Sequence, residues 1–128
     1  MRITDLLDAR SVSLTSSPKT KSEALDQAVA LMTKSGKIND EEAYRSQVYA
    51  REEESTTGIG EGIAIPHGKC DAVSRPGLAA MVIKNGVDFD SLDGEPVTLL
   101  FLIAAPNTKD NVHLDVLSKL SVMLMDEE

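Results

Sequence analysis

The fold of this chain is decided by the stretch Val97-Thr98-Leu99-Leu100-Phe101-Leu102-Ile103-Ala104, which is apolar at almost every position. A strand with one solvated face alternates apolar and polar residues, whereas a strand covered on both faces can be apolar throughout. The run is therefore typical of a central strand. Pro106 is expected to end it, because proline has no backbone N–H to continue a ladder. Upstream, Asn85-Gly86 and Asp93-Gly94 are turn signals.

Shorter strands and a helix are predicted before this run. Leu78–Ile83 predicts a second buried strand, and Ser11–Leu14 alternates polar and apolar residues, as a strand with one exposed face would. A capping-box pattern at Thr20 precedes a helix predicted over Lys21–Ser35. Gly36 follows as the expected stop, since glycine adopts the left-handed conformation that ends many helices.

Two further helices complete the predicted fold. A cap signal at Asn39 predicts a helix over residues 40–53, and the last helix is predicted from Thr108 or Asp110 to about Met125. This order of elements implies a single-domain α/β sandwich, with a mixed β-sheet flanked by helices on both faces.

Composition narrows the possible partners and compartments. A chain of 128 residues suits one domain that buries a core. The net charge of −8 argues against nucleic acid and anionic membranes as partners. A single cysteine excludes an internal disulfide and favours a reducing compartment. Without an apolar run long enough to span a membrane and without a secretory signal pattern, the chain is expected to be cytoplasmic.

The most informative segment for function is Gly58–Lys69 (GIGEGIAIPHGK), which places a histidine directly after a proline. Ile63–Ile65 suits a buried strand that stops at Pro66, so His67 is expected at a strand end, where chemistry is common in α/β proteins. The glycines would let backbone N–H groups approach an anion, which suits a phosphoryl group on imidazole. From residue types alone, a turn with a solvated histidine remains the alternative.

Other chemistries fit the chain less well. The glycines at 58, 60 and 62 lack the dinucleotide spacing, and no phosphate-binding loop of the Walker type is present, so no nucleotide cofactor is expected. His67 and Cys70 have a spacing found in zinc sites, but only His113 and carboxylates remain as further ligands, so no metal is expected. A Cys70 nucleophile would need a geometry that spacing cannot supply. The acidic run Glu52–Glu54 is interpreted as a solvated helix end.

The segment also matches a known signature. The acidic residue Glu52 stands seven positions before the apolar residue Ile59, which is followed directly by Gly60. After two further positions comes the run Ile-Ala-Ile-Pro-His-Gly, at residues 63–68. This pattern resembles the phosphorylation site of the mannitol/fructose-type IIA components of the sugar phosphotransferase system. The resemblance extends from about Ile3 to the last residue and implies one IIA type-2 domain over residues 1–128. The family usually continues with one or two more short elements, so the chain is expected to lack them.

The resemblance implies a role for three residues. His67 would accept a phosphoryl group on Nε2 from the phosphohistidine of the carrier protein HPr and pass it to a cysteine of a IIB domain. Arg51 shares a helix face with Tyr44 and Val48, and in the family an arginine at this place lies beside the histidine; a snorkelling arginine is the alternative. His113 matches the family's second histidine, which would bind or orient the phosphoryl group; a solvated histidine is the alternative.

Two functions follow from the resemblance. The first is a phosphotransferase relay for sugar uptake with a phosphohistidine intermediate. Residues 86–97 and 102–106 look most like fructose-type IIA domains, so fructose is the expected sugar. The second is a nitrogen-regulatory protein of the same fold, which would keep the histidine and control partner proteins through its phosphorylation state.

Overall fold

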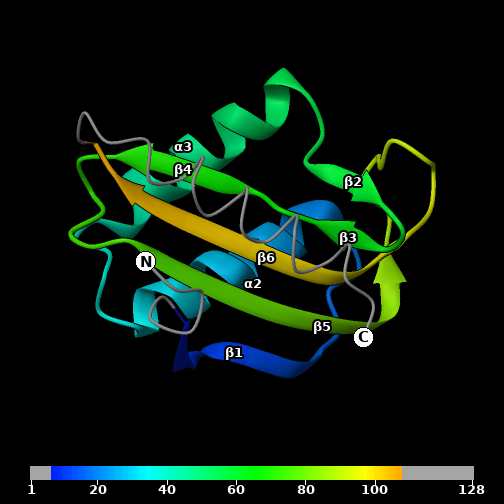
Figure 1. Ribbon diagram of the computed structural model, residues 1–128, viewed down its shortest axis with the longest axis horizontal. Helices are drawn as coiled ribbons and strands as arrows, with labels where there is room; N and C mark the ends of the chain where they lie inside the picture. Colours follow the sequence, from blue (N-terminus) through cyan, green and yellow to red (C-terminus); the bar gives the residue numbers. More distant parts are fainter. Residues whose placement is uncertain (1–6, 108–128) are drawn as a thin grey trace.

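The computed structural model describes residues 7–107 and has two helices packed on one β-sheet within that range (Figure 1). Its elements in chain order are β1 (Leu7–Ser16), α2 (Lys21–Lys34), α3 (Glu41–Glu54), β2 (Gly58–Gly60), β3 (Ile63–Ala64), β4 (His67–Cys70), β5 (Gly77–Val87) and β6 (Val97–Pro106).

The apolar run that begins at Val97 forms β6, which lies in the middle of the sheet. The strand order is β1-β5-β6-β3-β2, and β4 also pairs with β6. β5 pairs with β6 in the antiparallel sense, whereas β3 and β4 pair with it in the parallel sense. Four successive residues of β6, Leu102–Ala105, are buried, as expected of a strand covered on both faces. The predicted mixed α/β sheet is therefore confirmed.

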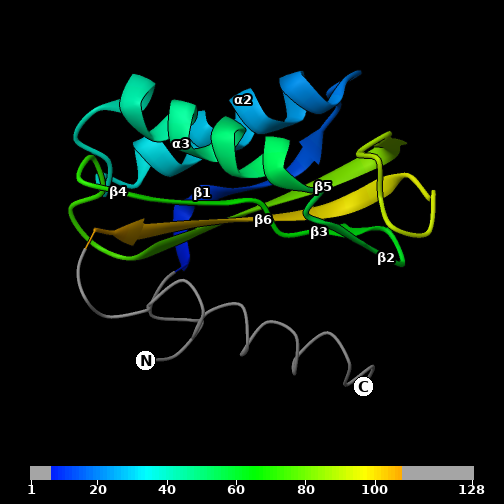
Figure 2. The ribbon, with the colours of Figure 1, turned by 90° about the horizontal axis from the view of Figure 1, so that it is seen from above.

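Both described helices lie on the same face of the sheet (Figure 2). α2 packs against β1 and β5, and α3 packs against β4. The core between these layers is built from aliphatic side chains, Tyr44 and Phe89, all of them fully buried or nearly so. The helix predicted over residues 108–125, which the sequence assigned to the sheet's flanks, lies outside the described residues.

The helix ends follow the predicted capping chemistry, with one shift. The Thr20 side chain accepts a hydrogen bond from the Glu23 N–H (3.1 Å), and Gly36 follows α2 with φ +80°. The cap of α3 is Asp40, which accepts from the Ala43 N–H (3.2 Å), and not Asn39 as predicted. Aspartate at position 40 competes for the same role with an equally good acceptor, so α3 begins one residue later.

One predicted turn is wrong. Asn85-Gly86 does not end a strand, because β5 continues to Val87. The register between β5 and β6 shifts between Val82 and Val87, and Gly86 has φ +72°. Glycine can supply a positive φ to an irregularity within a strand as well as to a turn, so the dipeptide cannot distinguish the two from sequence. The Asp93-Gly94 prediction is confirmed as a turn, with the Gly94 N–H bonded to the Ser91 carbonyl (2.9 Å).

The segment around Pro66 is an interrupted strand. β3 ends at Ala64, and β4 begins at His67 on the same neighbour, with Ala64 opposite Leu100 and His67 opposite Ile103. The register is thus unchanged across the break. The predicted stop before the histidine is correct, but His67 starts a strand and does not end one. Pro66 lacks a donor, yet its carbonyl still accepts from the Ile103 N–H (3.0 Å) and holds the chain on β6.

Candidate functional site

His67 stands at the first position of β4, partly buried, with its ring turned back on its own backbone. Its Nδ1 lies 3.2 Å from the carbonyl oxygen of Ile65. A carbonyl can only accept, so Nδ1 is assigned the proton, and the neutral ring then has its lone pair on Nε2. The local backbone therefore selects the tautomer in which Nε2 is the nucleophile.

The residue after the histidine allows β4 to pack tightly under α3. A Cβ atom on Gly68 would lie 3.0 Å from Tyr44 Cε1 and 3.1 Å from Val48 Cγ2. The Tyr44 hydroxyl donates to the carbonyl of Ile103 (2.7 Å), the residue paired with His67 on β6. Burial raises the pKa of Tyr44 well above its ordinary value, so this hydroxyl keeps its proton and remains a donor. α3 and β6 together fix the backbone of the Pro-His-Gly segment.

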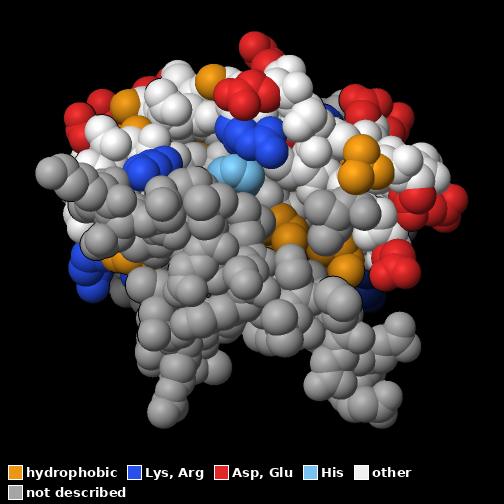
Figure 3. Space-filling view, turned by 45° about the horizontal axis from the view of Figure 1, so that its top comes forward, with side chains coloured by type: hydrophobic (Ala, Val, Ile, Leu, Met, Phe, Trp, Pro, Cys, Tyr) orange, Lys and Arg blue, Asp and Glu red, His pale blue; other side chains and the backbone are white. Residues whose placement is uncertain are grey.

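Arg51 lies at the C-terminal end of the same helix face. Tyr44 and Val48 on this face are buried, and Arg51 is partly buried, which confirms the predicted face. Its Nη1 donates to the Ser55 carbonyl (3.0 Å). Figure 3 shows the histidine at the molecular surface directly beside basic side-chain atoms. The positive charge of Arg51 acts on the His67 ring, where it disfavours the imidazolium form and would favour a bound anion.

The His67 pKa is lowered from 6.5, chiefly because burial disfavours the charged ring, and Arg51 lowers it further. The hydrogen bond to Ile65 and the charges of Glu52 and Glu54 act in the opposite direction but do not outweigh the burial. His67 is thus largely neutral, and nucleophilic, at pH 7.

An NMR titration of the His67 ring is expected to give a pKa below 6.5. The folded protein binds fewer protons than the unfolded chain, so His67 costs no stability above about pH 6.5 and makes the fold less stable as the pH falls below it. Replacing Arg51 with Gln removes a positive charge and should raise this pKa, whereas Lys69→Gln, on β4 itself, serves as the control. A pKa at or above 6.5 in the parent protein would contradict the burial argument.

The interpretation of Glu52 as part of a solvated helix end is wrong. The Glu52 side chain is buried. Thr57 donates to it from the backbone N–H (2.8 Å) and from the hydroxyl (2.7 Å), and Lys21 of α2 forms an ion pair with it (2.9 Å). Glu53 and Glu54 are exposed, as predicted. The spacing held a signal, since Glu52 follows Tyr44 and Val48 at four-residue intervals on the buried face.

The glycine segment contributes less to anion binding than its composition suggests. The Gly58 N–H bonds to the Thr56 hydroxyl (3.0 Å), and the Glu61 N–H bonds to Asp93 (2.9 Å), so neither donor is presented to a ligand. A Cβ atom on Gly58 would lie 2.4 Å from Ser91 Oγ. In this segment glycine mainly permits close contact with the loop between β5 and β6.

The remaining candidates are placed only in part. Cys70, at the end of β4, is a partly buried free thiol that packs against the core. Within residues 7–107, no group of three His, Cys, Asp or Glu side chains is placed to hold a metal ion. No helix in that range is long and apolar enough to cross a membrane. His113 lies outside the described residues.

Comparison with known proteins places the whole chain in one group. Residues 5–128 match the family described as the phosphoenolpyruvate-dependent sugar phosphotransferase system, EIIA 2. The chain is 47% identical over its full length to a fructose-specific EIIABC component of Bacillus subtilis, of which it spans 20%. It is 42% identical, over 91% of its length, to a fructose-specific EIIA component of Haloferax volcanii, of which it spans 76%.

Solved structures agree with this grouping. The nitrogen regulatory protein IIA-Ntr from Neisseria meningitidis superposes with a TM-score of 0.89 at 30% identity, over 98% of this chain and 85% of that one. IIA mannitol in its complex with phosphorylated IIB mannitol, from Escherichia coli, superposes with a TM-score of 0.81 at 31% identity, over 95% and 85% of the two chains.

Proposed function

Because the chain belongs to the EIIA 2 family of the phosphoenolpyruvate-dependent sugar phosphotransferase system, we propose that it relays phosphoryl groups through a phosphohistidine at His67. The observation on which this rests is the hydrogen bond from His67 Nδ1 to the Ile65 carbonyl, which leaves the lone pair on Nε2. The lowered pKa of His67 keeps the ring neutral, as a nucleophile requires.

The proposed transfer has two steps. Nε2 of His67 forms a bond to the phosphorus of phospho-HPr while the bond from phosphorus to the donor histidine breaks. A cysteine thiolate of a IIB domain then attacks the same phosphorus, and His67 leaves as the neutral ring. Most of the rate enhancement in such transfers comes from positioning the reacting groups and from stabilising the charge on the phosphoryl oxygens.

Arg51 is proposed to stabilise the phosphoryl oxygens. Its charge already acts on the His67 ring from the adjacent end of α3. A fixed cation stabilises the transferring phosphoryl group, because that group is anionic whereas the unphosphorylated histidine ring is neutral. His113 is proposed, on the family resemblance alone, to hydrogen-bond or orient the phosphoryl group.

A fructose-type IIB domain is the proposed acceptor. Two relatives, at 47% and 42% identity, are both named fructose-specific. Residues 86–97 and 102–106 carry the fructose-type likeness noted in the sequence. The nitrogen-regulatory function stays the second candidate, because the structural match to IIA-Ntr covers almost the whole chain.

Transfer assays distinguish these candidates. Phosphorylated protein is expected to pass its phosphoryl group to a fructose-type IIB cysteine far faster than to IIB domains of other classes. The control is the same set of acceptors with their cysteine replaced by serine. Equal rates across the classes would remove the sugar assignment. Efficient labelling from HPr without transfer to any IIB domain would favour the regulatory function.

A further inference from the structure

Glu52 is a buried carboxylate beside the site, and the proposed relay gives it no role. It is 8% exposed and lies on α3, one residue after Arg51. Oε2 accepts from the Thr57 N–H (2.8 Å), and Oε1 accepts from the Thr57 hydroxyl (2.7 Å). A carboxylate with both oxygens committed to one residue holds that residue in a single orientation.

Thr57 connects this carboxylate to the histidine ring. It is 5% exposed and immediately precedes β2. Its carbonyl accepts from the Ile65 N–H (3.0 Å), and the Ile65 carbonyl accepts from Nδ1 of His67 (3.2 Å). Hydrogen bonds and the backbones of Thr57 and Ile65 therefore link Glu52 to the ring nitrogen that sets the tautomer.

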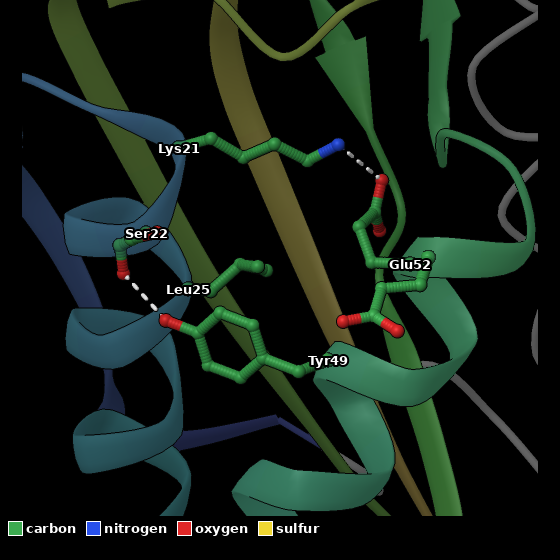
Figure 4. Close-up of a pocket in the computed structure, with 6 residues that line it drawn as sticks. Lys21, Ser22, Leu25, Tyr49 and Glu52 are labelled. Atoms are coloured by element: carbon green, nitrogen blue, oxygen red, sulfur yellow. Dashed lines mark hydrogen bonds and ion pairs between the residues drawn. The ribbon is translucent and has the colours of Figure 1, made fainter.

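Lys21 fixes Glu52 from the other side. Its Nζ lies 2.9 Å from Glu52 Oε2 and 4.7 Å from the centroid of the Phe89 ring. Figure 4 shows Lys21 reaching from α2 to Glu52 across a pocket of about 270 Å³. The Tyr49 hydroxyl in this pocket bonds to the Ser22 carbonyl and to Asp26. These contacts join α2 to α3 and hold the two helices together beside Glu52.

We propose that Glu52 is a positioning residue for phosphoryl transfer. By holding Thr57, it keeps the Ile65 carbonyl in place to accept from Nδ1, and so directs the lone pair of Nε2 toward the incoming phosphorus. The inference rests on the proposed function of His67 and deepens it. Arg51 acts on the transferring group through its charge, whereas Glu52 acts through the orientation of the ring.

Two effects of Glu52 must be separated, because its charge also raises the pKa of His67. Among the residues that the structure describes, the charges of Arg51 and Glu54, both on α3, also act on the ring. Glu52→Gln keeps the shape: its amide oxygen can accept from the Thr57 N–H, and its amide nitrogen can donate to the Thr57 hydroxyl. Glu52→Ala removes shape and charge together. Glu54→Gln removes a charge from an exposed residue and is the matched control.

The test compares the parent with these three variants by two measurements. The first is the ¹⁵N spectrum of the His67 ring in the unphosphorylated protein, which gives tautomer and pKa. The second is the rate of labelling by phospho-HPr. Glu52→Ala is expected to show a mixture of tautomers and labelling slowed by about 10–100-fold, as for loss of an orienting contact. Glu52→Gln and Glu54→Gln are expected to keep the parent tautomer and rate, with a lower His67 pKa.

Each other outcome is decisive. A folded Glu52→Ala protein with the parent tautomer and rate would overturn the proposal. A Glu52→Gln protein as impaired as Glu52→Ala would also overturn it, because charge and not position would then be the cause. If Glu52→Ala does not fold, Thr57→Val tests the same path: it removes one of the two contacts and should give a smaller change of the same kind. Absence of labelling in the parent would reject the relay function, and the tautomer spectra would still judge the role of Glu52.

Discussion

Replacing His67 with Ala is expected to abolish labelling by phospho-HPr, since no other described residue combines a histidine ring with the Pro-His-Gly backbone that selects Nε2. The partly buried ring can be removed without disturbing the contacts of Gly68 with Tyr44 and Val48, so the variant should fold. In the parent, the label should be lost in acid and survive base, as expected of a phosphorus–nitrogen bond. Gel or mass detection of incorporated phosphate measures the effect.

The matched control for this experiment is Lys69→Ala, two residues further along β4, which should label at the parent rate. Circular dichroism and thermal unfolding should be alike for the parent and both variants. A His67→Ala protein that labels normally would show that the phosphoryl group goes elsewhere, and the relay proposed for His67 would be wrong.

Arg51→Ala is expected to slow transfer by about 10²–10³-fold, the usual loss for one electrostatic stabiliser, with His67 still the labelled residue. His113→Ala is expected to act in the same direction. The reason for Arg51 is that its charge lies close enough to lower the pKa of the His67 ring, so it also acts on phosphoryl oxygens bound there. Rapid-quench kinetics with phospho-HPr measure both variants.

Arg45 provides the control for Arg51. It lies on the same helix but is engaged with Asp26, Glu41 and Glu42 through ion pairs. Arg45→Ala should therefore transfer at the parent rate, although it removes an equal charge. If Arg51→Ala and His113→Ala both transfer as fast as Arg45→Ala, neither residue stabilises the transferring group.

Much of the fold could be predicted because its signals are local. The first helix follows from its cap at Thr20, and the second from a cap signal that was placed one residue early, at Asn39 instead of Asp40. The central strand follows from a run that is apolar at almost every position. The predictions that failed concern residues whose conformation depends on the neighbouring strand of the sheet. Gly86 lies within a strand, at a shift of register, because β5 continues to Val87 beside β6. β4 resumes after Pro66 because β6 continues to offer hydrogen-bond partners.

The sequence predicted the central residue of the candidate site, His67, but not the buried contacts that hold its backbone in place. The Pro-His-Gly signature identifies His67, and the spacing of Tyr44, Val48 and Arg51 at i, i+4 and i+7 identifies the helix face that bears the arginine. The partners of the buried Glu52, Lys21 and Thr57, approach it only in the folded chain, so the acidic run did not identify them. Only the four-residue spacing from Tyr44 and Val48 indicated that Glu52 is buried. The strand stop at Pro66 was predicted, but the bond from Nδ1 to the Ile65 carbonyl depends on how the ring is oriented after that stop, which residue types do not specify.

The central claim is that the backbone of this segment makes Nε2 of His67 the atom that accepts the phosphoryl group. The most direct measurement is a ¹H–¹⁵N NMR spectrum of the phosphorylated protein, in which the nitrogen bonded to phosphorus splits by coupling to ³¹P. We expect the split signal on Nε2, with the proton retained on Nδ1 and its bond to the Ile65 carbonyl intact. A phosphorus bonded to Nδ1 of His67, or to another residue, would contradict the account.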